Sequence, residues 1–243
     1  MHDLTQRQIE ILKSLIEEYI ATASAVGSET LEKKHNLSAS PATIRNEMVK
    51  LTELGYLQKL HTSAGRVPTP VGMKFYVTQL MKEKELSVAE EVEVKEKLWD
   101  HRDKTQRFLK ELTSSLAEKT GALAVTTTED GNVYCAGYAN ILDMPEFFDI
   151  DVTRNLLIAI EEYDLIKSIF HPELEDEDVH VLLGAELGPR LIGPFGFVYS
   201  HFHTSMNSKG GIGVLGPTRL NYNYVVPAVR YYKNLVEEIV RGW

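Results

Sequence analysis

The sequence contains very little cysteine: Cys135 is the only one among 243 residues. A single thiol excludes a disulfide within the chain and is typical of proteins from a reducing compartment. The sequence also lacks any apolar run near the ~18 residues that a membrane span requires. Its first residues do not form the basic and apolar regions of a secretory signal. We therefore expect a cytoplasmic protein without membrane contact.

Positive charge is scarce, since the chain carries 26 Lys and Arg against 35 Asp and Glu, a net charge of −9. The deficit is uneven along the chain. Residues 40–81 carry five basic and two acidic side chains, whereas residues 82–243 carry 17 basic and 27 acidic ones. A locally basic segment in an acidic chain suits a protein that binds nucleic acid through one part only.

The first 81 residues carry the signals of a compact helical domain. Thr5 precedes an apolar periodicity that predicts a helix over 5–20, and Ser28 opens a short second helix. Ser40 is a predicted N-cap, followed by a proline at the first helical position, and Gly55 ends this third helix. Three helices in succession are compatible with a helix-turn-helix.

A hairpin and a fourth helix follow. Residues 56–60 and 66–67 predict two short strands around a polar tip, and Thr69 with the next proline opens a helix that ends near Met81. This order of elements is typical of a winged helix-turn-helix, whose ordinary use is to read duplex DNA. A winged helix that binds a partner protein through the same amphipathic helix is the alternative.

The predicted DNA contacts lie on the third helix and on the hairpin. On the helix, short polar groups approach the groove floor, while Arg, Asn and Lys donate to base edges and phosphates. On the hairpin, hydroxyl and backbone N–H groups bind phosphates and an arginine enters a minor groove. The candidate DNA-binding residues are Ser40, Thr43, Arg45, Asn46, Lys50, His61, Thr62, Ser63 and Arg66.

The remainder of the chain predicts a helical linker and an α+β domain. Residues 82–119 are rich in Lys and Glu and predict one long helix or two. Beyond them, strand patterns occur at 123–128, 133–139, 179–183, 196–203 and 211–215, and helix patterns at 155–163 and 221–240. We predict an antiparallel sheet with helices outside it, of the kind found in small-molecule sensors.

No pattern in this second domain predicts catalysis, so we expect neither an enzyme nor a bound cofactor. His201 and His203 alternate on a predicted strand and share a face, which could ligate a metal. A third ligand would have to come from His171, His180 or Cys135, at no recognisable spacing. We favour ordinary surface or core histidines, and a hydrolase or metalloenzyme built on them lacks converging ligands.

Three further features have structural explanations. The glycine-rich run 210–216 leads into a strand, whereas a phosphate loop opens a helix, so we reject nucleotide binding there. The acidic run 173–178 is most simply a solvated loop, with a divalent cation site as the alternative. Phe197, Tyr199 and Phe202 could line a ligand pocket, although filling the core is the simpler role.

Collinear segments along the chain carry a resemblance to a known family. They are residues 4–8, 19–23, 26–28, 40–46, 54–57, 61–69, 137–147 and 212–222. In these segments the chain closely resembles the HrcA family, the heat-inducible transcription repressors of bacterial chaperone operons. Family members are usually longer and carry an inserted segment where this chain has only residues 126–132, so the chain resembles a short member.

The resemblance implies a homodimer that binds an inverted-repeat operator in double-stranded DNA upstream of chaperone genes. It also implies that a chaperonin keeps the repressor competent, and that misfolded proteins compete for this chaperonin under heat stress. The residue patterns predict a winged helix at 1–81, a helical linker at 82–119 and a further domain at 120–243, and the resemblance implies that this last domain is a GAF-like regulatory and dimerisation domain. The alternative is a winged-helix regulator whose GAF-like body senses a small-molecule ligand.

Overall fold

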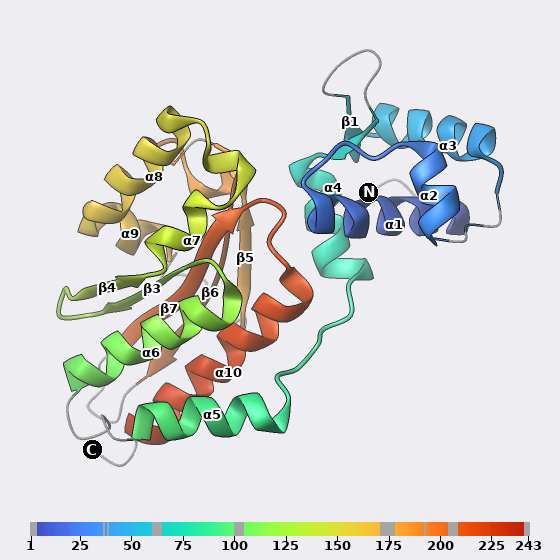
Figure 1. The fold of residues 1–243 in the computed structure, drawn as a ribbon. Helices are drawn as coiled ribbons and strands as arrows, with labels where there is room; N and C mark the ends of the chain where they lie inside the picture. The colour runs from blue at the N-terminus through green and yellow to red at the C-terminus, as the bar shows by residue number, and fades with distance from the viewer. Residues whose placement is uncertain are drawn as a thin grey trace. The chain divides into compact units, whose positions relative to one another are not determined.

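The computed structural model describes residues 4–35, 37, 39–59, 65–99, 105–170, 178–191, 193–203 and 209–240. The chain divides into two compact units, Met1–Lys82 and Glu83–Trp243. Each unit is described by itself below. Both are drawn in Figure 1, with the first unit in blue and cyan and the second running from green to red.

The first unit contains helices and a two-stranded antiparallel sheet (Figure 1). Its elements are α1 (Gln6–Thr22), α2 (Ser28–His35), α3 (Pro41–Glu53), β1 (Leu57–Gln58), β2 (Val67–Pro68), α4 (Pro70–Phe75) and the π-helical turn η1 (Tyr76–Leu80). This order is that of a winged helix-turn-helix, and it confirms the sequence-based prediction. The π-helical turn at the end of α4 was not predicted.

Local capping explains where these helices begin. Thr5 and Gln8 form a capping box at α1, in which each side chain bonds the other residue's backbone N–H. The Ser40 side chain accepts a hydrogen bond from the Thr43 N–H at α3, and Thr69 caps α4 in the same way. At the end of α3, Gly55 adopts a φ of 81°, a conformation that favours glycine.

The second unit is an α+β domain. Its strands are β3 (Leu123–Thr128), β4 (Val133–Ala136), β5 (His180–Leu183), β6 (Phe195–His203) and β7 (Lys209–Pro217). Its helices are α5 (Val88–Trp99), α6 (Thr105–Thr120), α7 (Tyr138–Leu142), α8 (Ile150–Glu161), α9 (Tyr163–Ile169) and α10 (Tyr222–Val240), with short 3₁₀ turns η2 (Pro145–Phe147) and η3 (Gly184–Leu187). The segment predicted as a linker therefore forms α5 and most of α6, and both belong to this unit.

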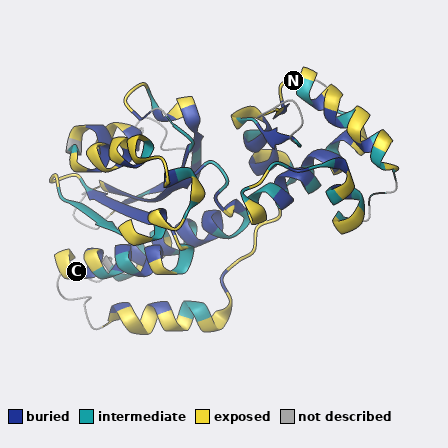
Figure 2. Cartoon of the chain, turned by 45° about the horizontal axis from the view of Figure 1, so that its top comes forward, coloured by how far each residue is buried: buried dark blue, intermediate teal, exposed yellow. Residues whose placement is uncertain are grey.

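The strands form one antiparallel sheet in the order β4-β3-β7-β6-β5. Helices cover both faces of the sheet, α6 and α10 on one and α8 and α9 on the other (Figure 1). The central strands β3, β6 and β7 are accordingly largely buried, as the dark blue in the sheet of Figure 2 shows, whereas the edge strand β4 is half-buried. The predicted antiparallel sheet with outer helices is confirmed.

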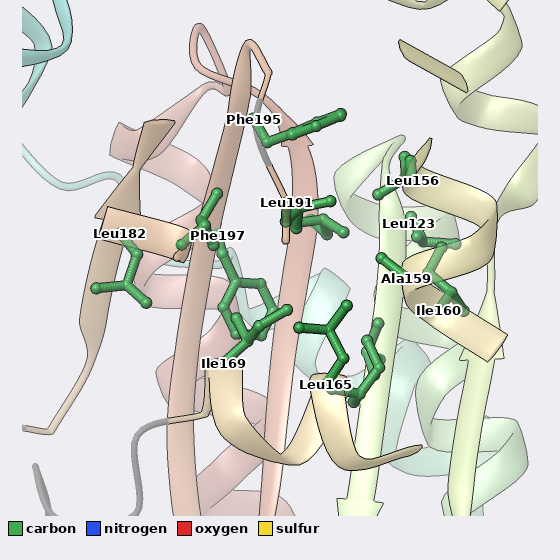
Figure 3. Close-up of a cluster of buried hydrophobic side chains, with 14 of the residues drawn as sticks. Leu123, Leu156, Ala159, Ile160, Leu165, Ile169, Leu182, Leu191, Phe195 and Phe197 are labelled. Atoms are coloured by element: carbon green, nitrogen blue, oxygen red, sulfur yellow. The ribbon is translucent and has the colours of Figure 1, made fainter. Parts of the chain in front are cut away.

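Alternating side chains of the strands face the helices on the two sides of the sheet. On β6, Phe195, Phe197 and Tyr199 face α8 and α9, where they join leucines and isoleucines of both helices in one cluster (Figure 3). On β3, Leu123 and Val125 join the same cluster, while Thr126 faces α6 and receives a hydrogen bond of 2.7 Å from Thr113. Because successive side chains of a strand point to opposite faces, each strand contacts the helices on both sides of the sheet.

The glycine-rich run lies inside β7 and makes room for aromatic rings. A Cβ on Gly211 would lie 2.4 Å from the Phe170 ring, and one on Gly213 would lie 2.7 Å from the Phe197 ring. The predicted strand, 211–215, was shorter at both ends than β7, because glycine and proline have a low strand propensity. Pairing with β3 and β6 extends the strand to Lys209–Pro217. Within the described ranges, no helix combines the length and apolar character of a membrane span.

Candidate nucleic-acid interface

Helix α3 presents the candidate recognition surface. Ile44, Met48 and Leu51 face the core of the first unit and are nearly inaccessible to solvent. The opposite side is exposed and carries Ala42, Arg45, Asn46, Val49, Lys50 and Glu53. We call these six residues the α3 outer face. An amide, a guanidinium and an ammonium on one exposed face can donate to base edges and phosphates in a major groove.

Two of the candidate residues serve the helix start. The Ser40 Oγ accepts from the Thr43 backbone N–H at 3.2 Å, and the two hydroxyl oxygens lie 3.0 Å apart. Ser40 is exposed and Thr43 is half-buried, so both hydroxyls also lie near solvent. The geometry assigns them a capping role, and their contact with phosphate stays a prediction.

Lys50 is held by a chain of contacts that the sequence did not reveal. Its Nζ lies 2.9 Å from Glu47 Oε1, and Glu47 Oε2 accepts from Gln8 Nε2 at 3.0 Å. The hydrogen bond from Lys50 holds the pKa of Glu47 below its ordinary value, so this carboxyl stays ionised at neutral pH. Since Gln8 also closes the α1 capping box, α1 fixes the side of α3 that bears Lys50.

Arg66 lies at the base of the hairpin. Its backbone exchanges two hydrogen bonds of 2.9 Å with Val26, which adds the α1–α2 connection to the wing as an isolated bridge. The residue is 9% exposed, and Nε donates to Thr52 Oγ1 on α3 at 3.0 Å. Burial lowers the pKa of the guanidinium. Arg66 thus joins the wing to α3.

The approach of backbone to backbone at this point requires Gly65. A Cβ at this position would lie 2.3 Å from the Val26 carbonyl oxygen, which is closer than real contacts allow. The other predicted wing residues, His61, Thr62 and Ser63, lie outside the described residues. Their role in binding DNA remains a prediction.

The site also contains residues that the sequence reasoning missed. Val49 lies on the α3 outer face between Asn46 and Glu53, where an apolar group can contact a thymine methyl. Its exposure is visible from the 3.6-residue period, because Val49 falls opposite Ile44 and Leu51. Thr52 accepts a hydrogen bond from Arg66, and Glu47 accepts one from Gln8. No local sequence pattern indicates either contact, because the partners lie far apart in the sequence.

Arg66 offers a prediction that separates a phosphate contact from a positioning role. Replacing Thr52 with Val removes the acceptor but keeps the side-chain shape, and Arg66→Met removes the donor. If Arg66 positions the wing, both variants should lose several-fold affinity for operator DNA without changing the slope of log K against log salt. A phosphate contact instead predicts that only Arg66→Met lowers this slope, by about 0.9 per contact. Titrations of the full chain at several salt concentrations measure both quantities.

The histidine candidates that the structure describes do not converge on a metal site. His180 on β5 stacks on Tyr199, with ring centroids 4.8 Å apart, and its ring lies 5.9 Å from that of His201. His203 lies near α10, with Nδ1 4.0 Å from Glu237. Cys135 is on β4, at the opposite edge of the sheet from β5. His171 lies outside the described residues. The described residues contain no group of three or more His, Cys, Asp or Glu that could hold a metal ion.

The remaining candidates have structural roles where the structure describes them. Burial raises the pKa of the Cys135 thiol to about 11, so at neutral pH it is protonated and poorly nucleophilic. Phe197 and Tyr199 pack edge-on against Phe170, with centroids 5.1 and 5.4 Å away. These rings fill the core, the simpler of their two interpretations. The acidic run at 173–178 lies outside the described residues except for Asp178, which pairs with Arg230.

The first unit and its exposed α3 define a DNA-binding protein of the winged helix-turn-helix class, joined to an α+β domain. Comparison with known families agrees with this assignment. Residues 3–76 match the family described as winged helix-turn-helix transcription repressor, HrcA DNA-binding. Residues 73–226 match the HrcA protein C-terminal domain. The chain belongs to the HrcA family, whose members are transcription repressors and not enzymes.

Relatives align along almost the whole chain. The heat-inducible transcription repressor HrcA of Pelotomaculum thermopropionicum is 28% identical, over 98% of this chain and 99% of that protein. The corresponding repressor of Thermomicrobium roseum is 26% identical, over 98% and 95%. A crystal structure described as that of a hypothetical protein shares the fold, with a TM-score of 0.79, 18% identity and 99% coverage of both chains.

The relatives are longer than this chain. The alignment with the Thermomicrobium repressor extends over 333 positions, against 243 residues here, so at least 90 positions of the alignment have no counterpart in this chain. This agrees with the resemblance to a short member of the family. We expect the shortening between β3 and β4, where residues 129–132 form a tight turn.

Proposed function

We propose that this chain is a repressor of heat-shock genes that binds an inverted-repeat operator as a homodimer. The observation that carries the proposal is the α3 outer face, on which Arg45, Asn46 and Lys50 are exposed on a capped and anchored helix. Two such helices related by a two-fold axis match the two arms of an inverted repeat, because protein and operator then share their symmetry. The repressor acts in the cytoplasm, on the chaperone genes that the family resemblance implies.

The second unit supplies the regulation in this proposal. It forms the GAF-like part that the resemblance implies, and its folding state sets the occupancy of the operator. A chaperonin keeps this unit folded, so that the chain can bind its operator. Under heat stress misfolded proteins compete for the chaperonin, the repressor loses activity and transcription rises. Of the residues that the structure describes, the aromatic side chains of the ligand-sensor alternative pack into the core, and this supports regulation through folding over regulation through a small ligand.

Transcription in vitro tests the proposal. The template is a chaperone-gene promoter with its inverted repeat, compared with the same promoter carrying a scrambled repeat of equal base composition. We expect the purified chain to lower transcript levels only from the intact template. After the chain is heated to a temperature at which its second unit begins to unfold, repression should fall, and added chaperonin should restore it. Equal repression of both templates would contradict the proposal.

A further inference from the structure

Large apolar side chains are exposed on one region of the second unit, from α7 through η2 to α8. They are Tyr138, Leu142, Phe148, Ile150, Leu157 and Ile158. Phe148 is 70% exposed and Ile150 is 65% exposed, although both types of side chain are usually buried. A concentration of exposed apolar residues on neighbouring elements of a soluble protein is typical of an interaction surface.

Helix α8 has two distinct sides. Thr153, Leu156 and Ile160 face the sheet and belong to the buried side, as Figure 3 shows for the latter two. Ile150, Leu157 and Ile158 point away from it. The buried side packs against the sheet and holds α8 in place. The exposed apolar side is therefore not needed to keep α8 and the sheet together. We call Ile150, Arg154, Leu157, Ile158 and Glu161 the α8 outer face.

The charges of the α8 outer face are complementary to the same face of a second copy. Arg154 and Glu161 are both exposed and lie seven residues, or about two turns, apart on one side of the helix. Leu157 and Ile158 lie midway between them. If a second α8 crosses antiparallel at this midpoint, Arg154 of each copy lies opposite Glu161 of the other, and the apolar side chains meet at the centre.

The local contacts of Arg154 are compatible with this pairing. Its Nη1 lies 2.5 Å from Asp151 Oδ1 one turn earlier on the same helix. A guanidinium has five N–H donors, so this bond leaves donors for a carboxylate on another molecule. The carboxylates of Asp149, Asp151 and Glu161 on and beside α8 oppose a role in binding DNA.

We infer that the α8 outer face, extended by Phe148, is the contact between two copies of this chain. This inference rests on the proposed function, because an inverted repeat is read by two heads. The relatives carry at least 90 aligned positions that this chain lacks, so its subunits must meet through surfaces that it retains. The α8 outer face combines an apolar centre with a self-complementary charged rim, as a two-fold interface requires.

Sedimentation equilibrium of the full chain without DNA tests the inference. The wild-type chain should be a dimer at about 10 μM. Arg154→Glu and Glu161→Arg each create two like-charge contacts across the two-fold, and Ile158→Asp places a charge at its centre. Each variant should raise the dimer dissociation constant about 100-fold or more. Lys110→Glu on α6 is the matched control for Arg154→Glu, since it makes the same charge change on an exposed site elsewhere and should leave the dimer unchanged.

Mixing two variants provides the sharpest result. In an equimolar mixture of Arg154→Glu and Glu161→Arg chains, every cross-subunit pair again joins opposite charges, so a heterodimer should form with near wild-type affinity. Misfolded chains could not show this rescue. A wild-type monomer at 10 μM would overturn the inference. So would a dimer that tolerates all three substitutions, which would leave the proposed function standing and place the interface elsewhere.

A half-site duplex separates this inference from the proposed function. The variants should bind a single operator arm as tightly as the wild-type chain does, and lose only the added affinity for two arms. Failure of the wild-type chain to prefer the operator arm over a scrambled duplex would contradict the proposed function, whatever the oligomeric state.

Discussion

Replacing Asn46 with Ala should lower the preference of the chain for its operator over a scrambled duplex by about 100-fold. Asn46 is exposed on the α3 outer face, and its amide can pair with both the N6 and N7 groups of an adenine. One such contact contributes about 1–3 kcal/mol of discrimination, and a dimer makes it twice. Arg45→Ala should act similarly through guanine. The measurement is the ratio of dissociation constants for the two duplexes.

Two substitutions on the same helix serve as controls. Lys50→Ala should weaken binding to both duplexes alike and reduce the salt slope, because an ammonium mainly neutralises phosphates. Glu53→Gln, at the exposed end of α3, should leave the preference for the operator unchanged. If Asn46→Ala and Arg45→Ala behave like Lys50→Ala, α3 does not read bases, and the site is wrongly assigned.

The second large effect concerns the ion pair between Glu146 and Arg219. Nε and Nη2 of Arg219 lie 2.6 and 3.1 Å from the two Glu146 oxygens, and both side chains are mostly buried. This pair ties η2 to the turn between β7 and α10. Removal of one partner leaves a poorly solvated charge, so Glu146→Ala should lower the free energy of unfolding by about 2–4 kcal/mol.

Urea unfolding of the full chain, followed by circular dichroism, measures this effect. The matched control is Glu162→Ala, which removes an ion pair with Arg190 whose side chains are about half exposed. Such a pair contributes at most about 1 kcal/mol. A double-mutant cycle with Arg219→Met should show strong coupling. Equal losses for Glu146→Ala and Glu162→Ala would show that the buried pair does not stabilise this unit.

The helix starts of the first unit and the positions of the strands along the chain could be predicted because their causes are local, whereas the order of the strands in the sheet was not predicted. Thr5, Ser40 and Thr69 cap their own helices, and the cap geometry follows from the next three residues. The strands of the second unit follow from alternating or continuous apolar runs between turn residues. The sequence carries only a weak signal for the break between α5 and α6. It therefore left open whether residues 82–119 form one helix or two.

Contacts between distant residues could not be predicted in the same way. Glu47 bonds Gln8 across 39 positions, and Glu146 bonds Arg219 across 73 positions. Nothing local to either partner specifies the other, since tertiary packing selects the pair. Glu146 and Arg219 fall in segments 137–147 and 212–222, which both carry the family resemblance. The hydrogen bond from Arg66 to Thr52 could not be predicted for the same reason, because Thr52 lies on another element, and a contact of Arg66 with DNA stays a prediction.

We propose that this chain reads operator sequence through α3. The most direct measurement is a fluorescence anisotropy titration of the full wild-type chain with a labelled chaperone-promoter inverted repeat and with a scrambled duplex, at two salt concentrations. We expect a preference for the inverted repeat of about 1,000-fold or more at both salt concentrations. Equal affinities that fall together as salt rises would contradict the claim, because they would show that the head binds only phosphates.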